Sequence, residues 1–412
     1  MIFNPVQPAA LPGDPLFDQV RNRLARDGSN DVAAAVSAAR RAARLLADDT
    51  VLAEWDHELS ARLTGAGPLE PLLEIDGVTD VLVNAPDEVW IDRGRGLEPA
   101  GVRFAGEADV RALAYRLAVS AGRRLDDAAP FVDAHLPDGS RLHAVIPPLT
   151  ERTTISLRVL ARQRLELADL IRAGTVSGAV ADVVRTLVEA RLAFLISGGT
   201  GSGKTTVLGA LLGLVPPDQR IVLIEDAAEL TTTHRHVVRL VARSANIEGA
   251  GAIDLRDLVR QSLRMRPDRV VVGEFRGAEV VELLAALNTG HAGGGATVHA
   301  NGMSDVPARL EALGALGGLD RRALTAQAAA ALDVVLHLER DADGGRRLTG
   351  IGWLGRDGDV LRVDAVWTSA GLGPGAPAMA AELERRCPGR VPALLAAASA
   401  RCPRHPAAAG AP

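Results

Sequence analysis

The chain has 412 residues and a single lysine, and that lysine lies in a short glycine-rich segment. The segment reads Gly198-Gly199-Thr200-Gly201-Ser202-Gly203-Lys204-Thr205, and the other 45 of the 46 basic residues are arginine. A compact ammonium on a flexible stem enters a phosphate-binding loop that a wide, planar guanidinium does not fit. The pattern G-x-x-x-x-G-K-T is a Walker A loop, which predicts that the chain binds a nucleoside triphosphate.

Each residue type in this loop has a predicted task. Glycines let backbone N–H groups turn inward around the β-phosphate, at the start of a helix whose positive end faces the anion. Lys204 is expected to reach the β- and γ-phosphates and the Thr205 hydroxyl to ligate Mg²⁺, so we expect ATP and Mg²⁺ as ligands. A glycine turn that only caps a helix is the weaker alternative, because eight positions match. The expected nucleotide-binding residues of the loop are Gly198, Gly199, Thr200, Gly201, Ser202, Gly203, Lys204, Thr205 and Thr206.

Length and composition bound the remaining possibilities. A chain of this length is expected to form two or three domains, and with 3% aromatic residues its cores must consist mostly of Ala, Val and Leu. The net charge of −5 gives no reason to expect direct nucleic-acid binding. Cys387 and Cys402 match no zinc spacing, so we expect free thiols in a reducing cytosol. Without a signal peptide or a long apolar run, a soluble protein with only peripheral membrane contact is expected.

Changes in composition along the chain indicate domain limits. Val78–Asn84 and Glu88–Ile91 are predicted to form a hairpin, and apolar spacing predicts a helix over 110–121. After about residue 168, continuous apolar runs such as 192–196, 221–224 and 270–272 predict a parallel sheet covered on both faces. The predicted division is a disordered lead (1–15), a helical segment (16–64), an α+β domain (65–160), a hinge linker (161–167), an α/β ATPase domain (168–365) and a flexible Ala/Pro/Gly-rich tail (366–412) with one helix near 378–385.

Acidic residues follow two of the predicted core strands. Glu225-Asp226-Ala227-Ala228-Glu229 comes after 221–224, and Glu274 comes after 270–272. Carboxylates at the C-terminal ends of parallel strands lie where such sheets bind ligands. Hydrolysis requires groups that activate water and hold a metal, and these acids are the candidates. Solvated loop acids remain the alternative.

A glycine-rich segment, 289–301, contains His291 and His299. Two histidines suggest metal ligation, but no carboxylate or cysteine nearby completes a ligand shell. We therefore favour imidazoles that sense the γ-phosphate.

Four motifs follow one another along the chain: the Walker A loop, the acidic box 224–230, the segment 263–274 and the histidine box 289–301. In that order they resemble the type II/IV secretion ATPase superfamily, and within it the tight-adherence (Flp-type) pilus assembly ATPases called TadA or CpaF. Further similarity lies in 67–73, Val83-Asn84 and 136–148. The resemblance covers about Gly65 to Leu338, and the absence of cysteine before 387 argues against the zinc-containing pilus branch.

The resemblance implies a fold and a set of roles. The fold is a RecA-like P-loop NTPase C-terminal domain, preceded by a smaller α+β (PAS-like) domain and an N-terminal helical segment. Glu229 would be the general base, Glu274 would hold Mg²⁺ through water, and His299 and His291 would be sensors. Arg141 and Arg158 would neutralise phosphate charge, in the manner of arginine fingers. Three departures from relatives are His135 in place of arginine, the glycines 293–295, and the polar stretch 231–236.

The implied function is a homohexameric ATPase motor that acts on an inner-membrane platform protein, from the cytoplasmic face, to assemble a Flp or type IV-like pilus or to secrete protein. Two other interpretations remain open. One is a slowly hydrolysing, nucleotide-gated scaffold, against which the intact Glu229 and Glu274 argue. The other is a conjugal-transfer or type IV secretion ATPase, although the acidic net charge disfavours direct DNA binding.

Overall fold

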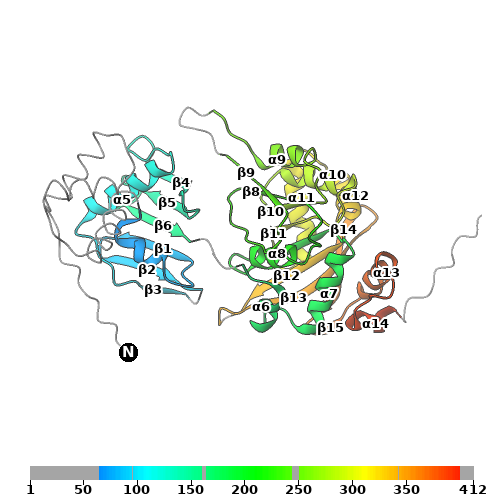
Figure 1. Cartoon of the computed structure of the whole chain (residues 1–412). Coiled ribbons are helices and arrows are strands. Elements are labelled where there is room, and N and C mark those ends of the chain that lie inside the picture. The colour runs from blue at the N-terminus through cyan, green and yellow to red at the C-terminus, as the bar shows by residue number, and fades with distance from the viewer. Residues whose placement is uncertain (1–64, 95, 160–163, 244–249, 342, 400–412) are drawn as a thin grey trace, which may run out of the picture. The chain divides into compact units, whose positions relative to one another are not determined.

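A computed structural model describes residues 65–94, 96–159, 164–243, 250–341 and 343–399, which divide into two compact units at residues 160–161 (Figure 1). The predicted disordered lead and helical segment, residues 1–64, lie outside the described residues, as do Cys402 and the first part of the predicted linker.

The first unit is an antiparallel sheet with one long helix. The strand order is β3-β2-β1-β6-β5-β4, and the core joins Val81 and Leu157 of the sheet to Val110 and Leu113 of α5. The predicted hairpin and helix are confirmed. The elements are η1 (Gly67–Leu69), α4 (Glu70–Leu73), β1 (Asp80–Ala85), β2 (Glu88–Asp92), β3 (Leu97–Pro99), α5 (Glu107–Ser120), β4 (Phe131–His135), β5 (Arg141–Val145) and β6 (Thr154–Arg158).

The second unit is built on a nine-stranded sheet with the order β15-β14-β13-β12-β7-β11-β10-β8-β9. The strands from β12 to β9 are parallel, as predicted, and β13, β14 and β15 extend the sheet with antiparallel strands. This is the RecA-like α/β fold. The strands are β7 (Phe194–Gly198), β8 (Ile221–Glu225), β9 (Val237–Val241), β10 (Arg269–Phe275), β11 (Gly295–His299), β12 (Val334–Arg340), β13 (Arg346–Asp357), β14 (Val360–Thr368) and β15 (Gly371–Leu372).

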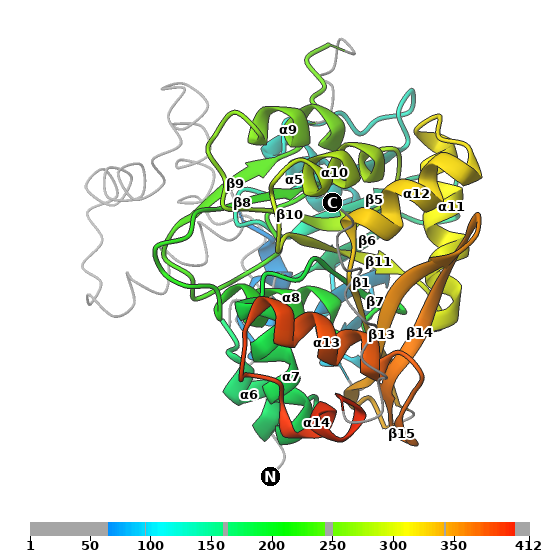
Figure 2. The same cartoon turned by 90° about the vertical axis from the view of Figure 1, so that its right-hand side faces the viewer.

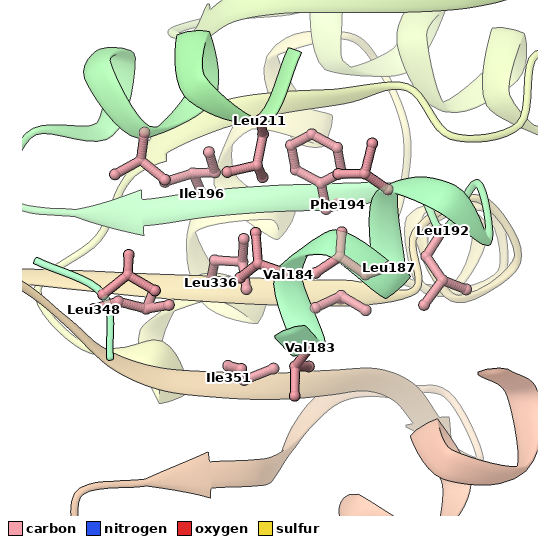
Figure 3. Close-up of a cluster of buried hydrophobic side chains, with 14 of the residues drawn as sticks. Val183, Val184, Leu187, Leu192, Phe194, Ile196, Leu211, Leu336, Leu348 and Ile351 are labelled. Atoms are coloured by element: carbon pink, nitrogen blue, oxygen red, sulfur yellow. The ribbon is translucent and has the colours of Figure 1, made fainter. Parts of the chain in front are cut away.

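Helices cover both faces of this sheet. Phe194 and Ile196 of β7 belong to one apolar cluster and Leu195 to the other, because successive strand residues point to opposite faces. Figure 3 shows the first cluster, where α7, β7, α8, β12 and β13 meet. On that face lie α6 (Leu167–Arg172), α7 (Gly178–Glu189), α8 (Lys204–Leu212), α13 (Ala376–Arg386) and α14 (Ala393–Ser399); on the other lie α9 (Leu255–Ser262), α10 (Glu279–Asn288), η2 (Met303–Asp305), α11 (Val306–Leu316) and α12 (Arg321–Ala331). Within the described ranges, no helix is long and apolar enough to cross a membrane.

The predicted flexible tail needs correction. Up to residue 399 this segment completes β14, adds β15 and forms α13 and α14, with α14 beside α7 (Figure 2). Met379, Leu383 and Leu395 are fully buried in the first cluster. The prediction of a flexible tail was wrong because alanine and proline dominate this segment, and only a few large apolar side chains hold it against the domain.

Candidate functional site

The glycine-rich loop joins the end of β7 to the start of α8. Gly198, Gly201 and Gly203 have φ values of +154°, +71° and +92°, a region that side chains other than glycine rarely adopt. A Cβ on Gly198 would lie 2.4 Å from the carbonyl oxygen of Leu338 in β12. The glycines are therefore required by backbone conformation and by the closeness of the neighbouring strand.

Donors of the loop converge on one acceptor. The Nζ of Lys204 donates to the carbonyl oxygens of Gly199 at 2.8 Å and Gly198 at 3.0 Å. The hydroxyl of Ser202 donates to the same Gly199 oxygen at 2.9 Å, and its backbone N–H does so at 3.4 Å. Burial lowers the pKa of Lys204, the Glu274 carboxylate counteracts this, and Arg276 adds to the lowering. An anionic oxygen is a stronger acceptor than a carbonyl, so this donor set fits a phosphate.

His299 and Glu274 lie on the same side of β7. In the ladder, His299 of β11 pairs with Gly198, which places it beside the start of the loop. The pairing of β10 with β11 shifts between Val272 and Phe275, so Glu274 lies in an irregular part of its strand. Such bulges redirect side chains near functional sites. The Thr297 hydroxyl fixes this irregularity, because it donates to the carbonyl oxygen of Gly273 at 2.7 Å.

Arg276 connects the acidic groups. Its Nε donates to Glu274 Oε2 at 2.7 Å, and its Nη1 lies 3.8 Å from Asp226 Oδ2. The sequence analysis missed this arginine, although its position two residues after Glu274 was a usable signal. Arg276 therefore fixes the Glu274 side chain and links the ends of β10 and β8.

The two glutamates of the acidic box have different environments. Glu225 is 4% exposed; its Oε1 accepts from the backbone N–H of Leu230 at 2.8 Å and of Glu229 at 3.2 Å. Its Oε2 lies 2.9 Å from Arg239 Nε. Burial raises the pKa of Glu225 to about 7, although the two N–H groups and Arg239 act against this. Glu225 thus holds the turn on which the half-buried Glu229 is presented.

The segment after Glu229 crosses the helix that follows the P-loop. A Cβ on Gly209 of α8 would lie 2.1 Å from the Thr231 carbonyl oxygen, and one on Gly213 would lie 2.7 Å from Thr233 Oγ1. This contact brings the acidic box to α8, although β8 and β7 are separated by two strands. From the polar stretch 231–236, this contact uses the main-chain oxygen of Thr231 and the hydroxyl of Thr233. The missed signal was Gly209 within a helix otherwise rich in Leu and Ala, followed by Gly213 directly after its end.

The structure corrects the prediction for His291. Its Nδ1 lies 3.1 Å from the Ala286 carbonyl oxygen, in the segment that precedes β11. Strand β11 runs parallel to β7, with Gly295 opposite Phe194 and His299 opposite Gly198. His291 therefore lies at the opposite end of the strands from the loop, and the length of β11, ~16 Å, separates the two. Within this chain it does not join His299 as a sensor of the γ-phosphate.

The glycines 293–295 allow close packing of the backbone at that end of the strands. Cβ atoms on Gly294 and Gly295 would lie 2.3 Å and 2.6 Å from the carbonyl oxygens of Val270 and Phe194. The fully buried Arg269 donates to the Gly293 carbonyl oxygen at 3.1 Å, and burial lowers the pKa of Arg269 to about 10. The departure from relatives at 293–295 is explained by this close approach.

The two arginines expected at phosphate lie opposite each other in the first unit, Arg141 on β5 and Arg158 on β6. Each has a carboxylate partner: Arg141 Nε donates to Asp133 Oδ1 at 2.8 Å, and Arg158 Nε lies 3.2 Å from Asp80 Oδ1. The hydrogen bond from Arg141 lowers the pKa of Asp133. Their proposed role at a phosphate would require at least part of this pairing to be exchanged.

Comparison with known proteins is independent of this geometry. The family model of "Type II/IV secretion system protein" matches residues 62–348. A Mycobacterium tuberculosis protein, provisionally named a conjugal transfer protein, is 58% identical over 330 residues, which cover 78% of this chain and 94% of the relative. The type IV secretion system protein PtlH of Bordetella pertussis is 32% identical over 321 residues, covering 70% and 94%. The solved VirB11 ATPase of the Brucella suis type IV secretion system aligns with a TM-score of 0.36 and 25% identity, covering 69% and 95%.

Proposed function

The chain belongs to the type II/IV secretion system protein family, and from this premise we propose that it hydrolyses ATP to drive a secretion or pilus assembly machine. The observation that carries the nucleotide-binding part of this proposal is the convergence of Lys204 Nζ and the two Ser202 donors on the oxygen of Gly199. A triphosphate would take over these donors at the edge of the sheet where Glu274 and the acidic box also lie.

In the proposed reaction, Glu229 accepts the proton of the attacking water, and Lys204 with the loop N–H groups binds the β- and γ-phosphates. Mg²⁺ would be held by the Thr205 hydroxyl and, through water, by Glu274, and would neutralise phosphate charge. Arg276 keeps the Glu274 carboxylate in place. His299, paired with Gly198, would pass the state of the γ-phosphate to the P-loop strand.

The finer assignment is a homohexameric ring at the cytoplasmic face of the inner membrane, where it acts on a platform protein. We propose assembly of a Flp-type pilus as its task, on the strength of the motifs in the first unit and the P-loop unit. Arg141 and Arg158 would then supply positive charge to a bound nucleotide, in exchange for their present carboxylate partners.

A second candidate, transport in a conjugal-transfer or type IV secretion system, is favoured by the names of the relatives, including the 58% identical one. The net charge of −5 argues that such a motor would act on protein components rather than grip DNA itself. Gene deletion separates the candidates. A deletion strain complemented with wild type but not with Glu229→Gln should regain surface pili; recovery of plasmid transfer without pili would instead support the second candidate.

The hydrolysis proposal is tested by ATPase rate and by mass from light scattering, with and without Mg·ATP. Wild type should form a large assembly and turn over ATP, Lys204→Ala should lose nucleotide binding, and Glu229→Gln should bind without turnover. Wild-type turnover by Glu229→Gln would show that another group is the base. Nucleotide binding by wild type with no turnover would favour the nucleotide-gated scaffold.

A further inference from the structure

The P-loop has a second set of neighbours, on the side of β7 away from the carboxylates. Strand β12 pairs with β7 so that Leu338 lies opposite Gly198, and β13 runs back antiparallel beside β12. Arg346, the first residue of β13, donates from its Nε to the carbonyl oxygen of Gly201 at 3.0 Å. A Cβ on Gly203 would lie 3.1 Å from Arg346 Cδ. The side chain of Arg346 therefore lies along the outside of the loop.

A second arginine occupies the neighbouring position. Arg340 ends β12 directly opposite Arg346 in the ladder, and its Nη1 lies 3.6 Å from the place of a Cβ on Gly201. We call Arg340 and Arg346 the arginine pair. Both guanidinium groups therefore lie beside the phosphate-binding loop.

The next residue shows that this is not the general behaviour of arginine on β13. Arg347 lies opposite Glu339 and forms an ion pair with Asp341 at 3.4 Å. Arg346 forms no ion pair with any residue in the described ranges. Its side chain is exposed, and only its Nε is used by the Gly201 carbonyl. Its terminal N–H groups are therefore available to a ligand at the loop.

The bond to Gly201 also orients the loop. In a trans peptide the carbonyl and the following N–H point in opposite directions. With the Gly201 oxygen turned outward to Arg346, the N–H of Ser202 points into the loop, where it donates to the Gly199 oxygen at 3.4 Å. Arg346 thereby holds ready one of the N–H groups that the phosphate is expected to use.

We propose that the arginine pair is a second phosphate-binding element of the nucleotide site, supplied by the same chain and contacting the phosphate groups of a nucleoside di- or triphosphate. The proposal rests on the nucleotide binding proposed above. Because β12 and β11 flank β7 on opposite sides, the pair lies away from Glu274 and His299. It therefore acts on nucleotide affinity and leaves the activation of water to the carboxylates.

The test uses the full chain and measures the affinity for ADP and ATP by calorimetry, the KM and kcat of ATP hydrolysis, and the melting temperature without nucleotide. Arg346→Ala and Arg340→Ala should each weaken binding and raise KM about tenfold or more, with kcat at saturation kept. Without nucleotide, both variants should melt close to the wild-type temperature, because both side chains are exposed. Arg347→Ala is the matched control and should bind as wild type does.

Two results would overturn the proposal: unchanged affinity in both variants, or an equal loss of affinity in Arg347→Ala. A lower melting temperature of the nucleotide-free variants, with unchanged affinity, would assign the pair a purely structural role. Lys204→Ala separates this failure from that of the proposed function. If wild type and Lys204→Ala are equally unable to bind nucleotide, the proposed function fails; if only Lys204→Ala fails to bind while both arginine variants bind normally, the arginine pair is excluded.

Discussion

The two sides of strand β7 present different side chains. Toward β11, β10 and β8, the ends of the strands present Glu274, Glu225 and Glu229 with one histidine. Toward β12 and β13 they present two arginines against the outside of the loop. Carboxylates can activate water and hold a metal, whereas guanidiniums can only bind anions. Under the proposed roles, hydrolysis and phosphate binding would depend on side chains from separate strands, and a mutation could change one without the other.

In the part of the chain that the structure describes, two pairs of arginines lie directly opposite each other on neighbouring strands. Arg141 and Arg158 in the first unit each have an aspartate partner. Arg346 in the second unit has the P-loop carbonyl of Gly201 as its partner. Motif resemblance identified the first pair, and only the fold identified the second, because residues 340 and 346 meet at the loop through sheet pairing.

The largest expected effect concerns the acidic side. Glu229→Gln should lower kcat by roughly a hundredfold to ten-thousandfold, the usual contribution of a positioned general base, and leave nucleotide affinity within a few-fold of wild type. Single-turnover hydrolysis and calorimetric ADP binding measure the two quantities. Asp218→Asn, an exposed carboxylate at the opposite end of β8, is the control. A loss of affinity equal to the loss of kcat would break the proposed separation of the two sides.

The second prediction concerns pH and the buried Glu225. Its pKa is raised from 4.5 to about 7, so the folded chain keeps a proton that the unfolded chain releases between these values. The stability contributed by this group is therefore complete below about pH 4.5 and falls as pH rises to about 7, by up to roughly 3 kcal/mol. Denaturant unfolding at several pH values should show this slope in wild type and in Glu229→Gln. Glu225→Gln, which cannot ionise, should lack it; an unchanged slope would show that Glu225 is ionised in the fold.

A third prediction sharpens the link between the acidic box and the loop. Gly209→Ala would press a methyl group against the Thr231 carbonyl, 2.1 Å from its Cβ, and should lower the free energy of unfolding by about 1–3 kcal/mol and also reduce kcat. Gly213→Ala is the matched comparison and should have the smaller effect, because its Cβ would lie 2.7 Å from the movable Thr233 hydroxyl and no closer than 3.2 Å to a backbone atom, the Ala210 carbonyl oxygen. Thermal melting and turnover measure both. Equal, small effects would mean that the crossing segment does not position Glu229.

The smallest expected effect concerns the arginines of the first unit. Arg141→Ala and Arg158→Ala should each change stability by only about 0–1 kcal/mol, because both ion pairs are partly exposed. ADP affinity should stay within about twofold of wild type, in contrast to the arginine pair of the second unit, whose bonds are worth a tenfold change. If these variants lose turnover while keeping affinity, the charge-neutralising role proposed for them is supported. If turnover is unchanged, they are surface ion pairs only.

Much of the fold was predictable from local pattern. The apolar runs before the loop, before Glu225 and before Glu274 predicted β7, β8 and β10, and alternation predicted the hairpin of β1 and β2. These succeed because a strand buried on both faces must be apolar throughout. At the end of the chain, one helix was predicted near 378–385 and corresponds to α13, but the segment was expected to be flexible. Its order was missed because α13 and α14 are held by a few contacts with α7 and the sheet.

The sequence by itself determined the chemistry of the loop, because a phosphate-binding turn requires glycines with positive φ and one flexible ammonium within eight consecutive residues. Tertiary structure decided which distant side chains share that loop. In the fold, His291 lies at the opposite end of the strands, the segment after the acidic box packs against Gly209, and Arg346 contacts Gly201. Those outcomes depend on strand order and on which end of each strand faces the site. Both are fixed by packing between residues far apart in the chain, so residue types and spacing within one segment do not determine them.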